Sequence, residues 1–447
     1  MDNKRRDFLK KATLATAGLS LANGVNAMSA SSYNNIIGSN DRINVAIQGL
    51  GRRYGAFLKG ITDKKNNVRL TYLCDVMQSQ MDDAAKKLSE KINYKPELEE
   101  DIRKILDDKD VDAVFMATPD HWHTPGAIMG MQAGKHIYLE KPCSHNPWEN
   151  QLVVEAQKKY NKVVQMGNQQ RSSPQSIKIV KDIHEGVIGK AYKAIAFYTN
   201  GRGAVPKPVK AAPPEGLNWD LFQGPAPRKD YTHDTWNYNW HWYGWDYGTA
   251  EMGNNATHEL DIARWALDVK YPNYVDVLAE KNQFVDDGWE MYDDMLATYK
   301  FEDDKIIQWD GVSRNAYPKY GRGRGTIIYG TDGSVMVDRG GFERFDRQGK
   351  SVEIMRSGEE EGGVALGGGG DLSTRHTVNF FDGIRGKKAL TSPIDVGAMS
   401  QMLTHYANIS YRIDSGFDVD ENSGQIFDRD AMQLWTRTYE PGWKPKI

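Results

Sequence analysis

The chain has 447 residues, of which 39% are hydrophobic and 26% are charged, and its formal net charge is -3. At about 150 residues per domain the length predicts two or three domains, and the composition excludes a disordered, collagen-like or multi-span membrane chain. Because no long basic run follows the first dozen residues, we expect no nucleic-acid partner.

Residues 1–30 are predicted to be an export signal rather than part of the fold. A basic start, KRRDFLK, precedes an uncharged stretch at 12–22, and small residues at 25–30 offer cleavage sites. The adjacent Arg5 and Arg6 resemble the twin-arginine signal, with an ordinary secretory signal as the alternative. The twin-arginine route carries proteins that are already folded around their cofactors. We therefore expect a periplasmic or otherwise exported mature chain of net charge -6, with a bound cofactor and no membrane span.

A strand, a glycine-rich turn and a helix then predict a dinucleotide site. The strand-like run at 43–48 leads into GLGRRYG, where Gly49 would allow a tight turn and Gly51 a close approach of the backbone to a pyrophosphate. The N–H groups of a helix starting near Ala56 would face the same phosphates. The third glycine comes one position late, with Tyr54 in its usual place, so we expect a variant turn.

A second strand at 69–74 ends in Asp75, whose carboxylate is placed to accept hydrogen bonds from the adenosine ribose. Since an acid at this position disfavours a 2′-phosphate, NAD is expected rather than NADP. The alternation continues along the chain. Helices are predicted at 84–92, 98–106 and 127–133, and strands at 112–117 and 136–139. This order predicts a parallel sheet with right-handed crossovers, and ligands of such sheets lie at the carboxyl ends of the strands.

Five segments together resemble the glucose–fructose oxidoreductase / inositol dehydrogenase / MocA superfamily (Gfo/Idh/MocA). They are ATPDHWH, AGKHIYLEKP, MGNNATHELDIARWAL at 252–267, TVNFFDGIRGKKAL at 377–390 and SQMLTHYANISYR at 400–412. The resemblance implies an α/β protein. A doubly wound Rossmann domain at 41–165 would bind NAD(P). A C-terminal α/β domain at 166–447, with a large, mostly antiparallel open sheet, would bind substrate and form homo-oligomers.

The resemblance also implies catalytic roles. Lys141 of the Glu-Lys-Pro motif would stabilise negative charge on the substrate oxygen, and the family often has a cis bond before this proline. His258 would take the hydroxyl proton, and Asp261 would either assist it or pair with Arg264. The family commonly has aspartate where this chain has Asn254, which cannot take up a proton and is assigned to the substrate.

Further site residues follow from the same comparison. The polar stretch QMGNQQR faces the nicotinamide in the family, which assigns Asn168 to the cofactor and Arg171 to the substrate, with a plain polar loop as the alternative. His121 and His123 flank Trp122 without a nearby third ligand, so no metal site is predicted. The residues expected along the cofactor are Gly49, Gly51, Arg52, Arg53, Asp75, Thr118, Pro119, His123, Glu140, Lys141 and Asn168.

Residues 231–247, YTHDTWNYNWHWYGWDY, contain eight tryptophans and tyrosines and two histidines. Flat apolar rings with polar edges suit the faces and hydroxyl rims of sugars. We assign Trp240, His241 and Tyr247 to substrate contact, with a loop packed under its own aromatics as the alternative. The glycine-rich run at 362–370 is expected to be a flexible loop.

Two enzyme classes fit these residues. The first is an exported NAD-dependent oxidoreductase acting on a hydroxyl of a sugar or glycoside, with the hydride passing to a tightly held nicotinamide. The alternative is an NAD-dependent glycosidase, which oxidises the sugar transiently, eliminates the substituent, adds water and reduces the sugar again. A noncatalytic sugar sensor is a third class, and the presence of both Lys141 and His258 argues against it.

Overall fold

The computed structural model describes residues 41–357 and 372–447. The predicted export signal and the predicted loop at 362–370 lie outside the described residues. Within the described ranges, no helix combines the length and apolar character needed to cross a bilayer.

The first sheet is parallel and has six strands in the order β3-β2-β1-β4-β5-β6. This confirms the predicted doubly wound arrangement: β2 and β3 lie on one side of β1, and β4, β5 and β6 lie on the other. The elements are β1 (Ile43–Gln48), α3 (Gly55–Thr62), β2 (Val68–Cys74), α4 (Gln78–Ser89), β3 (Glu97–Glu99), α5 (Ile102–Asp107), β4 (Ala113–Met116), α6 (His123–Gln132), β5 (His136–Leu139), α7 (Pro147–Tyr160) and β6 (Val164–Met166).

Both faces of this sheet are covered. Apolar side chains of α3 and α4 form one buried cluster with the strands, and those of α5, α6 and α7 form another. The prediction of a helix over 98–106 was wrong at its start, because Leu98 pairs with Leu73 in an edge strand. The helix begins only after Asp101, whose carboxylate accepts the N–H of Arg103 and caps the first turn.

The second sheet has ten strands and is mostly antiparallel, as expected. Its order is β15-β14-β13-β12-β7-β10-β9-β8-β16, and β11 pairs with β7 beside this path. The strands are β7 (Ala191–Gly201), β8 (Tyr274–Glu280), β9 (Asp294–Lys300), β10 (Ile306–Val312), β11 (Arg314–Asn315), β12 (Arg324–Gly330), β13 (Gly333–Asp338), β14 (Gly341–Asp346), β15 (Ser351–Arg356) and β16 (Phe417–Asp418).

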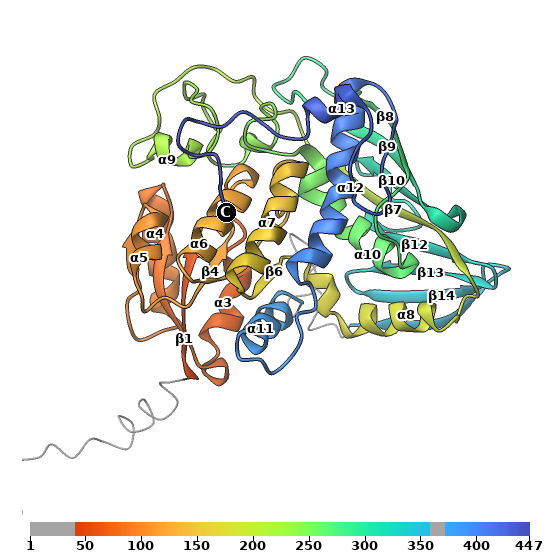
Figure 1. The fold of residues 1–447 in the computed structure, drawn as a ribbon, viewed down its shortest axis with the longest axis horizontal. Helices are drawn as coiled ribbons and strands as arrows, with labels where there is room; N and C mark the ends of the chain where they lie inside the picture. Colours follow the sequence, from red (N-terminus) through yellow and green to blue (C-terminus); the bar gives the residue numbers. More distant parts are fainter. Residues whose placement is uncertain (1–40, 358–371) are drawn as a thin grey trace, which may run out of the picture. The chain divides into compact units, whose positions relative to one another are not determined.

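Helices cover one face of the second sheet and also connect it to the first. Buried side chains of α8 (Pro174–His184), α10 (Thr257–Leu267) and α12 (Ile394–Ile413) pack on the strands. Figure 1 shows α12 running between α10 and α7, and α11 (Leu372–Ile384) beside α3 of the first sheet. Because α11 and α12 come late in the chain yet pack on the first sheet, the boundary at 165/166 stays a prediction. Two short helices, α9 (Trp219–Gln223) and α13 (Arg429–Gln433), complete the set of described α-helices.

Candidate functional site

A cavity of about 1580 Å³ lies between the carboxyl ends of the first sheet and the second sheet. One wall is formed by the glycine-rich turn after β1, by Asp75 after β2, by Thr118–Asp120, Trp122 and His123 after β4, and by Glu140–Lys141 after β5. The opposite wall carries side chains of β7 and β12, the aromatic stretch and His258 of α10. The residues that follow β1, β2, β4 and β5 therefore meet at one edge of the first sheet, as its parallel topology requires.

The turn after β1 fits a dinucleotide. Gly49 has φ +88°, and a Cβ there would lie 2.5 Å from the carbonyl oxygen of Ala117, so only glycine allows this approach of β1 to β4. No Cβ contact would form at Gly51, which leaves open space beside the backbone. Tyr54, in the place of the usual glycine, is buried in the core under α3, and α3 has no side-chain cap on its first N–H groups.

Asp75 lines the cavity directly after β2, where the sequence predicts the adenosine ribose of the cofactor. Its carboxylate accepts the backbone N–H of Leu50 at 2.6 Å and that of Met77 at 2.9 Å, which ties the glycine-rich turn to the end of β2. Burial raises the pKa of the Asp75 carboxyl to about 6, against these hydrogen bonds, which lower it. The carboxylate is therefore mostly ionised at pH 7 and is placed to accept from ribose hydroxyls.

We expect Asp75→Ala to weaken NAD binding by about tenfold or more while affecting NADP much less, because the lost acceptors serve ribose hydroxyls rather than a 2′-phosphate. Asp75→Asn keeps one acceptor oxygen, so its affinity for NAD should lie between those of the wild type and Asp75→Ala. Dissociation constants for both nucleotides, measured by calorimetry, check this. An unchanged ratio of NAD to NADP affinity would show that Asp75 does not bind the ribose hydroxyls.

Lys141 lines the cavity where β5 ends, and the peptide bond to Pro142 is cis, as the family comparison implied. Its ammonium donates to the backbone oxygen of Asn254 at 2.7 Å. That oxygen is presented by a turn of π-helix at Met252–Ala256, an irregular geometry that often marks functional sites. Burial lowers the pKa of Lys141, and the carboxylate of Asp120 opposes this shift.

Glu140 is held between three partners at the base of the site. Its carboxylate accepts from Arg53 at 2.6 Å and from Gln169 at 2.9 Å, and the backbone at Gly167 packs against it so closely that a Cβ would lie 2.8 Å away. Arg53 and Glu140 both line the cavity. The ion pair fixes the glycine-rich turn against the strand end that carries Lys141.

His258 lines the same cavity on the opposite wall. Burial lowers the pKa of its imidazole well below 6.5, and the positive charges of Arg339 and Lys141 lower it further. The ring is therefore neutral at physiological pH and can accept a proton. Asp120, buried and hydrogen-bonded to Thr249 at 2.6 Å, has its carboxyl pKa raised to about 6 by burial, so a second proton-accepting group lies beside Lys141.

His123 and Thr118 carry buried polar atoms without partners among the described residues. His123 Nδ1 lies 2.5 Å from the oxygen of Pro142, whereas its Nε2 and the Thr118 hydroxyl oxygen have no hydrogen bond. Both residues line the cavity, so a bound ligand would satisfy these atoms. His121 instead points away from it, with Nε2 2.8 Å from the oxygen of Phe222.

Buried neutral histidines should make the protein sensitive to acid. Burial lowers the pKa of each, so below pH 6.5 the unfolded chain binds more protons, and each costs about 1.4 kcal/mol of stability per pH unit. Asp75 and Asp120 act oppositely, because their stabilising contribution is lost as pH rises through about 6. The histidines are His121, His123, His145, His241, His258, His376 and His405.

Because the histidines outnumber the two acids, we expect a markedly lower thermal unfolding midpoint at pH 5 than at pH 7. Both measurements should be made with saturating NAD, so that loss of cofactor does not contribute. A midpoint that is equal or higher at pH 5 would show that these rings are protonated in the folded chain.

The aromatic stretch contributes to the cavity only in part. Trp240 and His241 line it, and their rings stack with centroids 3.5 Å apart. Tyr238 also lines it: its ring centroid lies 4.3 Å from that of His241 and 4.2 Å from the guanidinium of Arg52. Tyr247 does not line it. Its ring is buried against Phe222 and its hydroxyl donates to Gln223, so the structure does not bring it to the cavity wall, and its assignment to substrate contact stays a prediction.

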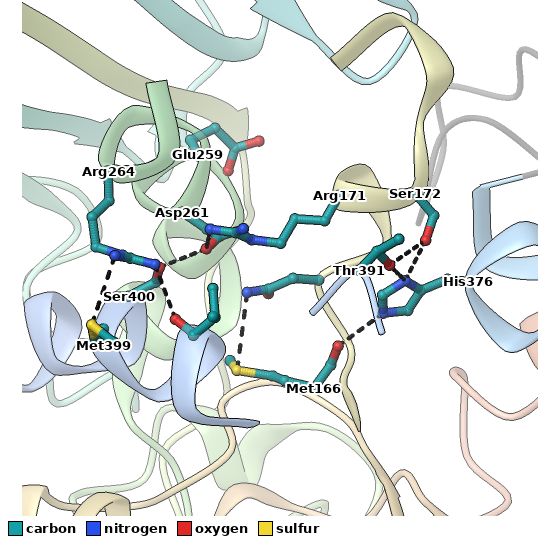
Figure 2. Close-up of polar contacts among 12 residues, drawn as sticks. Met166, Arg171, Ser172, Glu259, Asp261, Arg264, His376, Thr391, Met399 and Ser400 are labelled. Atoms are coloured by element: carbon teal, nitrogen blue, oxygen red, sulfur yellow. Dashed lines mark hydrogen bonds and ion pairs between the residues drawn. The ribbon is translucent and has the colours of Figure 1, made fainter. Parts of the chain in front are cut away.

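Asp261 and Arg171 form a buried ion pair outside the cavity lining (Figure 2). Two hydrogen bonds of 2.7 and 2.9 Å join them, and Asp261 also accepts from Ser400, which in turn accepts from Arg264. Each of these side chains has the other as its partner and neither lies on the cavity wall, which favours a structural role; catalysis by Asp261 and substrate contact by Arg171 stay predictions. Pairing of Asp261 with Arg264 is indirect, through Ser400.

Asn168, predicted to touch the cofactor, also falls outside the cavity lining. It is buried beside Met166, and Gln169, the next residue, lines the cavity instead. The other predicted contacts, including Asn254, do line it; they are Gly49, Gly51, Arg52, Arg53, Asp75, Thr118, Pro119, His123, Glu140, Lys141, Trp240, His241, Asn254 and His258.

Comparison with known proteins places this site in a family. Residues 43–168 match the model of the Gfo/Idh/MocA oxidoreductase family with an NAD-binding Rossmann fold, and residues 222–336 match the C-terminal domain of the same family. The chain belongs to the Gfo/Idh/MocA family. It is accordingly an oxidoreductase whose first domain binds NAD.

Curated relatives in this family include two kinds of enzyme. A glycosyl hydrolase family 109 protein of Shewanella baltica is 24% identical over 377 residues, which cover 76% of each chain. Levoglucosan dehydrogenase of Pseudarthrobacter phenanthrenivorans is 31% identical over 167 residues, covering 37% of this chain and 36% of that one.

Solved structures share the Gfo/Idh/MocA fold. A levoglucosan dehydrogenase in complex with NADH and levoglucosan aligns with a TM-score of 0.63 and 20% identity, covering 84% of this chain and 99% of that chain. The aldose-aldose oxidoreductase of Caulobacter crescentus, complexed with glycerol, aligns with a TM-score of 0.62 and 16% identity, covering 85% and 100%.

Sequence reasoning missed several residues on the cavity wall. Asp120 was read as part of a motif without a role, and Gln169 was passed over for its neighbour. Arg202, Arg324 and Arg339 come from the second sheet or its turns, and only strand pairing brings them to the site. The one local signal of a site residue here was a charged side chain, such as Arg324, in a mostly uncharged strand.

Proposed function

We propose that this protein oxidises a hydroxyl group of a sugar or glycoside, with NAD bound along the carboxyl ends of the first sheet. The observation that carries the proposal is the single cavity that brings Lys141 and His258 to the dinucleotide-binding turn. NAD supplies the hydride acceptor when bound. Relatives named for sugars and glycosides support a saccharide as the substrate class.

The chain's own groups divide the work on the substrate. The Lys141 ammonium lies where it stabilises negative charge developing on the reacting oxygen, and neutral His258 accepts the hydroxyl proton. Burial lowers the pKa of His258 and repulsion by Arg339 and Lys141 lowers it further, so the imidazole is a weak base that gives the proton up again readily. Trp240 and His241 offer a flat stacked surface for the sugar ring.

An NAD-dependent glycosidase is the second candidate, favoured by the alignment with glycosyl hydrolase family 109 proteins over 76% of the chain. The net redox change separates the two. Purified protein should be incubated with free sugars and with aryl glycosides, with and without added NAD. Stoichiometric NADH with a ketosugar supports the dehydrogenase, and release of the phenol without NADH supports the glycosidase. Neither product with any sugar would contradict the proposed function.

We also propose that the mature protein is exported through the twin-arginine signal at its N-terminus. Replacing Arg5 and Arg6 by lysine should leave the protein in the cytoplasm of a twin-arginine-competent host. Export of that variant at the normal level would contradict the proposal.

We further propose a homo-oligomer formed through the second sheet. Leu278 and Leu296 lie opposite each other on β8 and β9 and are 72% and 40% exposed, which supports a contact on this face. Sedimentation of wild type and of Leu278→Asp tests this. A monomer in both would contradict it.

A further inference from the structure

Arginines gather where the second sheet lines the cavity. Arg324 begins β12, Arg322 precedes it, Arg339 lies in the tight turn between β13 and β14, and Arg356 ends β15. All four line the cavity. Such a concentration of guanidinium groups is typical of sites that recognise carboxylates or phosphates.

Three of these arginines already have carboxylate partners. Arg324 forms two hydrogen bonds with Glu259, at 2.7 and 2.9 Å. Arg322 and Arg356 share the carboxylate of Asp338, at 2.7 and 2.9 Å. Those carboxylates are therefore not available to the fourth arginine.

Arg339 differs from its neighbours. Within residues 41–357 and 372–447 it has neither a hydrogen bond nor an ion pair. Burial and repulsion by Arg324 together lower the pKa of its guanidinium to about 9, so the group stays charged at neutral pH. A partly buried charge that no carboxylate of the described residues pairs with would be stabilised by an anion entering the cavity.

The position of Arg339 points to the substrate rather than to the cofactor. Of the charges that depress the pKa of His258, that of Arg339 has the largest effect, ahead of Lys141. The strand register agrees with this: Thr326 of β12 lies opposite Val337 of β13, which brings Arg339 close to Arg324. Arg324 in turn bonds Glu259, the residue after His258, so Arg339 lies on the same wall as the proposed proton acceptor. The cofactor pyrophosphate is expected instead at the turn containing Gly49 and Gly51, which belongs to the opposite wall.

We propose that the substrate is an anionic saccharide, carrying a carboxylate or a sulfate or phosphate ester, and that Arg339 binds this group beside His258. The inference rests on the proposed function, because it specifies the substrate class of the same site. Arg339 is a specificity-determining residue in this account. Its guanidinium forms charge-assisted hydrogen bonds to the anion, and these are typically the strong ones.

The test measures binding, so it does not depend on turnover. NAD-loaded protein is titrated by calorimetry with matched pairs: glucose against glucuronate, glucose 6-sulfate and glucose 6-phosphate, and the corresponding galactose series. We expect at least one anionic sugar to bind about 10- to 100-fold more tightly than its neutral partner. If no anionic sugar binds more tightly than its neutral partner, the proposal is overturned.

Variants assign the effect to Arg339. Arg339→Gln should remove the preference for the anion and leave both NAD content and binding of the neutral sugar unchanged. Arg339→Lys, which keeps the charge but not the planar fork, should retain part of the preference. Arg347→Gln, which removes an exposed arginine in the turn between β14 and β15, outside the cavity lining, is the matched control and should change nothing.

The outcomes separate this inference from the proposed function. Neutral sugars that bind and are oxidised, without any gain from an anionic group, would overturn the inference alone. Failure of every sugar, neutral or anionic, to bind would overturn both. Loss of NAD from Arg339→Gln would show that the anion is the cofactor's own pyrophosphate, which also overturns the inference.

Discussion

Replacing Lys141 by methionine should lower kcat/KM for the sugar substrate by about 10²- to 10³-fold, the loss typical of removing one preorganised group that stabilises developing negative charge. Methionine keeps most of the volume of the lysine stem and removes the ammonium. That ammonium is held by the oxygen of Asn254 at 2.7 Å and faces the cavity, so its charge acts at a fixed place.

The readouts that accompany this variant decide what was lost. NAD content should fall far less than kcat/KM does, because Lys141 is one of many expected cofactor contacts, Glu140 remains paired with Arg53 and the glycine-rich turn is intact. Lys181→Met, which removes a highly exposed lysine on α8, is the control for loss of a positive charge. If Lys141→Met keeps wild-type activity, Lys141 does not take part in the chemistry.

Asp261→Ala should destabilise the protein by about 3–5 kcal/mol, the range measured when one partner of a buried ion pair is removed. The side chains of Arg171 and Asp261 are only 5% and 2% exposed, so the arginine would remain charged and without its carboxylate. Ser400 would lose an acceptor as well. The free energy of unfolding in urea measures this effect.

A double variant separates a structural role from a catalytic one. Arg171→Met with Asp261→Leu removes both charges, and it should recover much of the stability lost in Asp261→Ala. If Asp261 is structural, that double variant keeps most of its activity under conditions where it is folded. An Asp261→Ala protein of normal stability that has lost its turnover would instead restore the catalytic assignment.

The first wall of the site was predictable because parallel strands present their carboxyl ends at one edge. Gly49 and Asp75 directly follow strands, and Lys141 is the second residue after β5; these positions in the chain were enough to bring the three together. The edge strand at Glu97–Glu99 was not predictable from its local pattern, since it is three residues long and exists only through pairing with β2.

The second wall was predicted less well because it depends on contacts far apart in the chain. Asp261 lies one helical turn after His258, yet its side chain pairs with Arg171, which is 90 residues away in the chain. No local sequence pattern predicts that pairing. Tyr247 belongs to an aromatic run whose members divide between cavity and core according to the neighbours they meet. Arg339 reaches the site only through the register of β13 and β14.

The most direct test of the account is the nucleotide that the purified protein carries and what a sugar does to it. The account predicts that denaturation releases NAD in near-stoichiometric amount. It also predicts that adding a substrate sugar to the native protein, without free NAD, converts the bound nucleotide to its reduced form, seen as new near-ultraviolet absorbance. A protein that neither carries NAD nor binds it on titration would contradict the account.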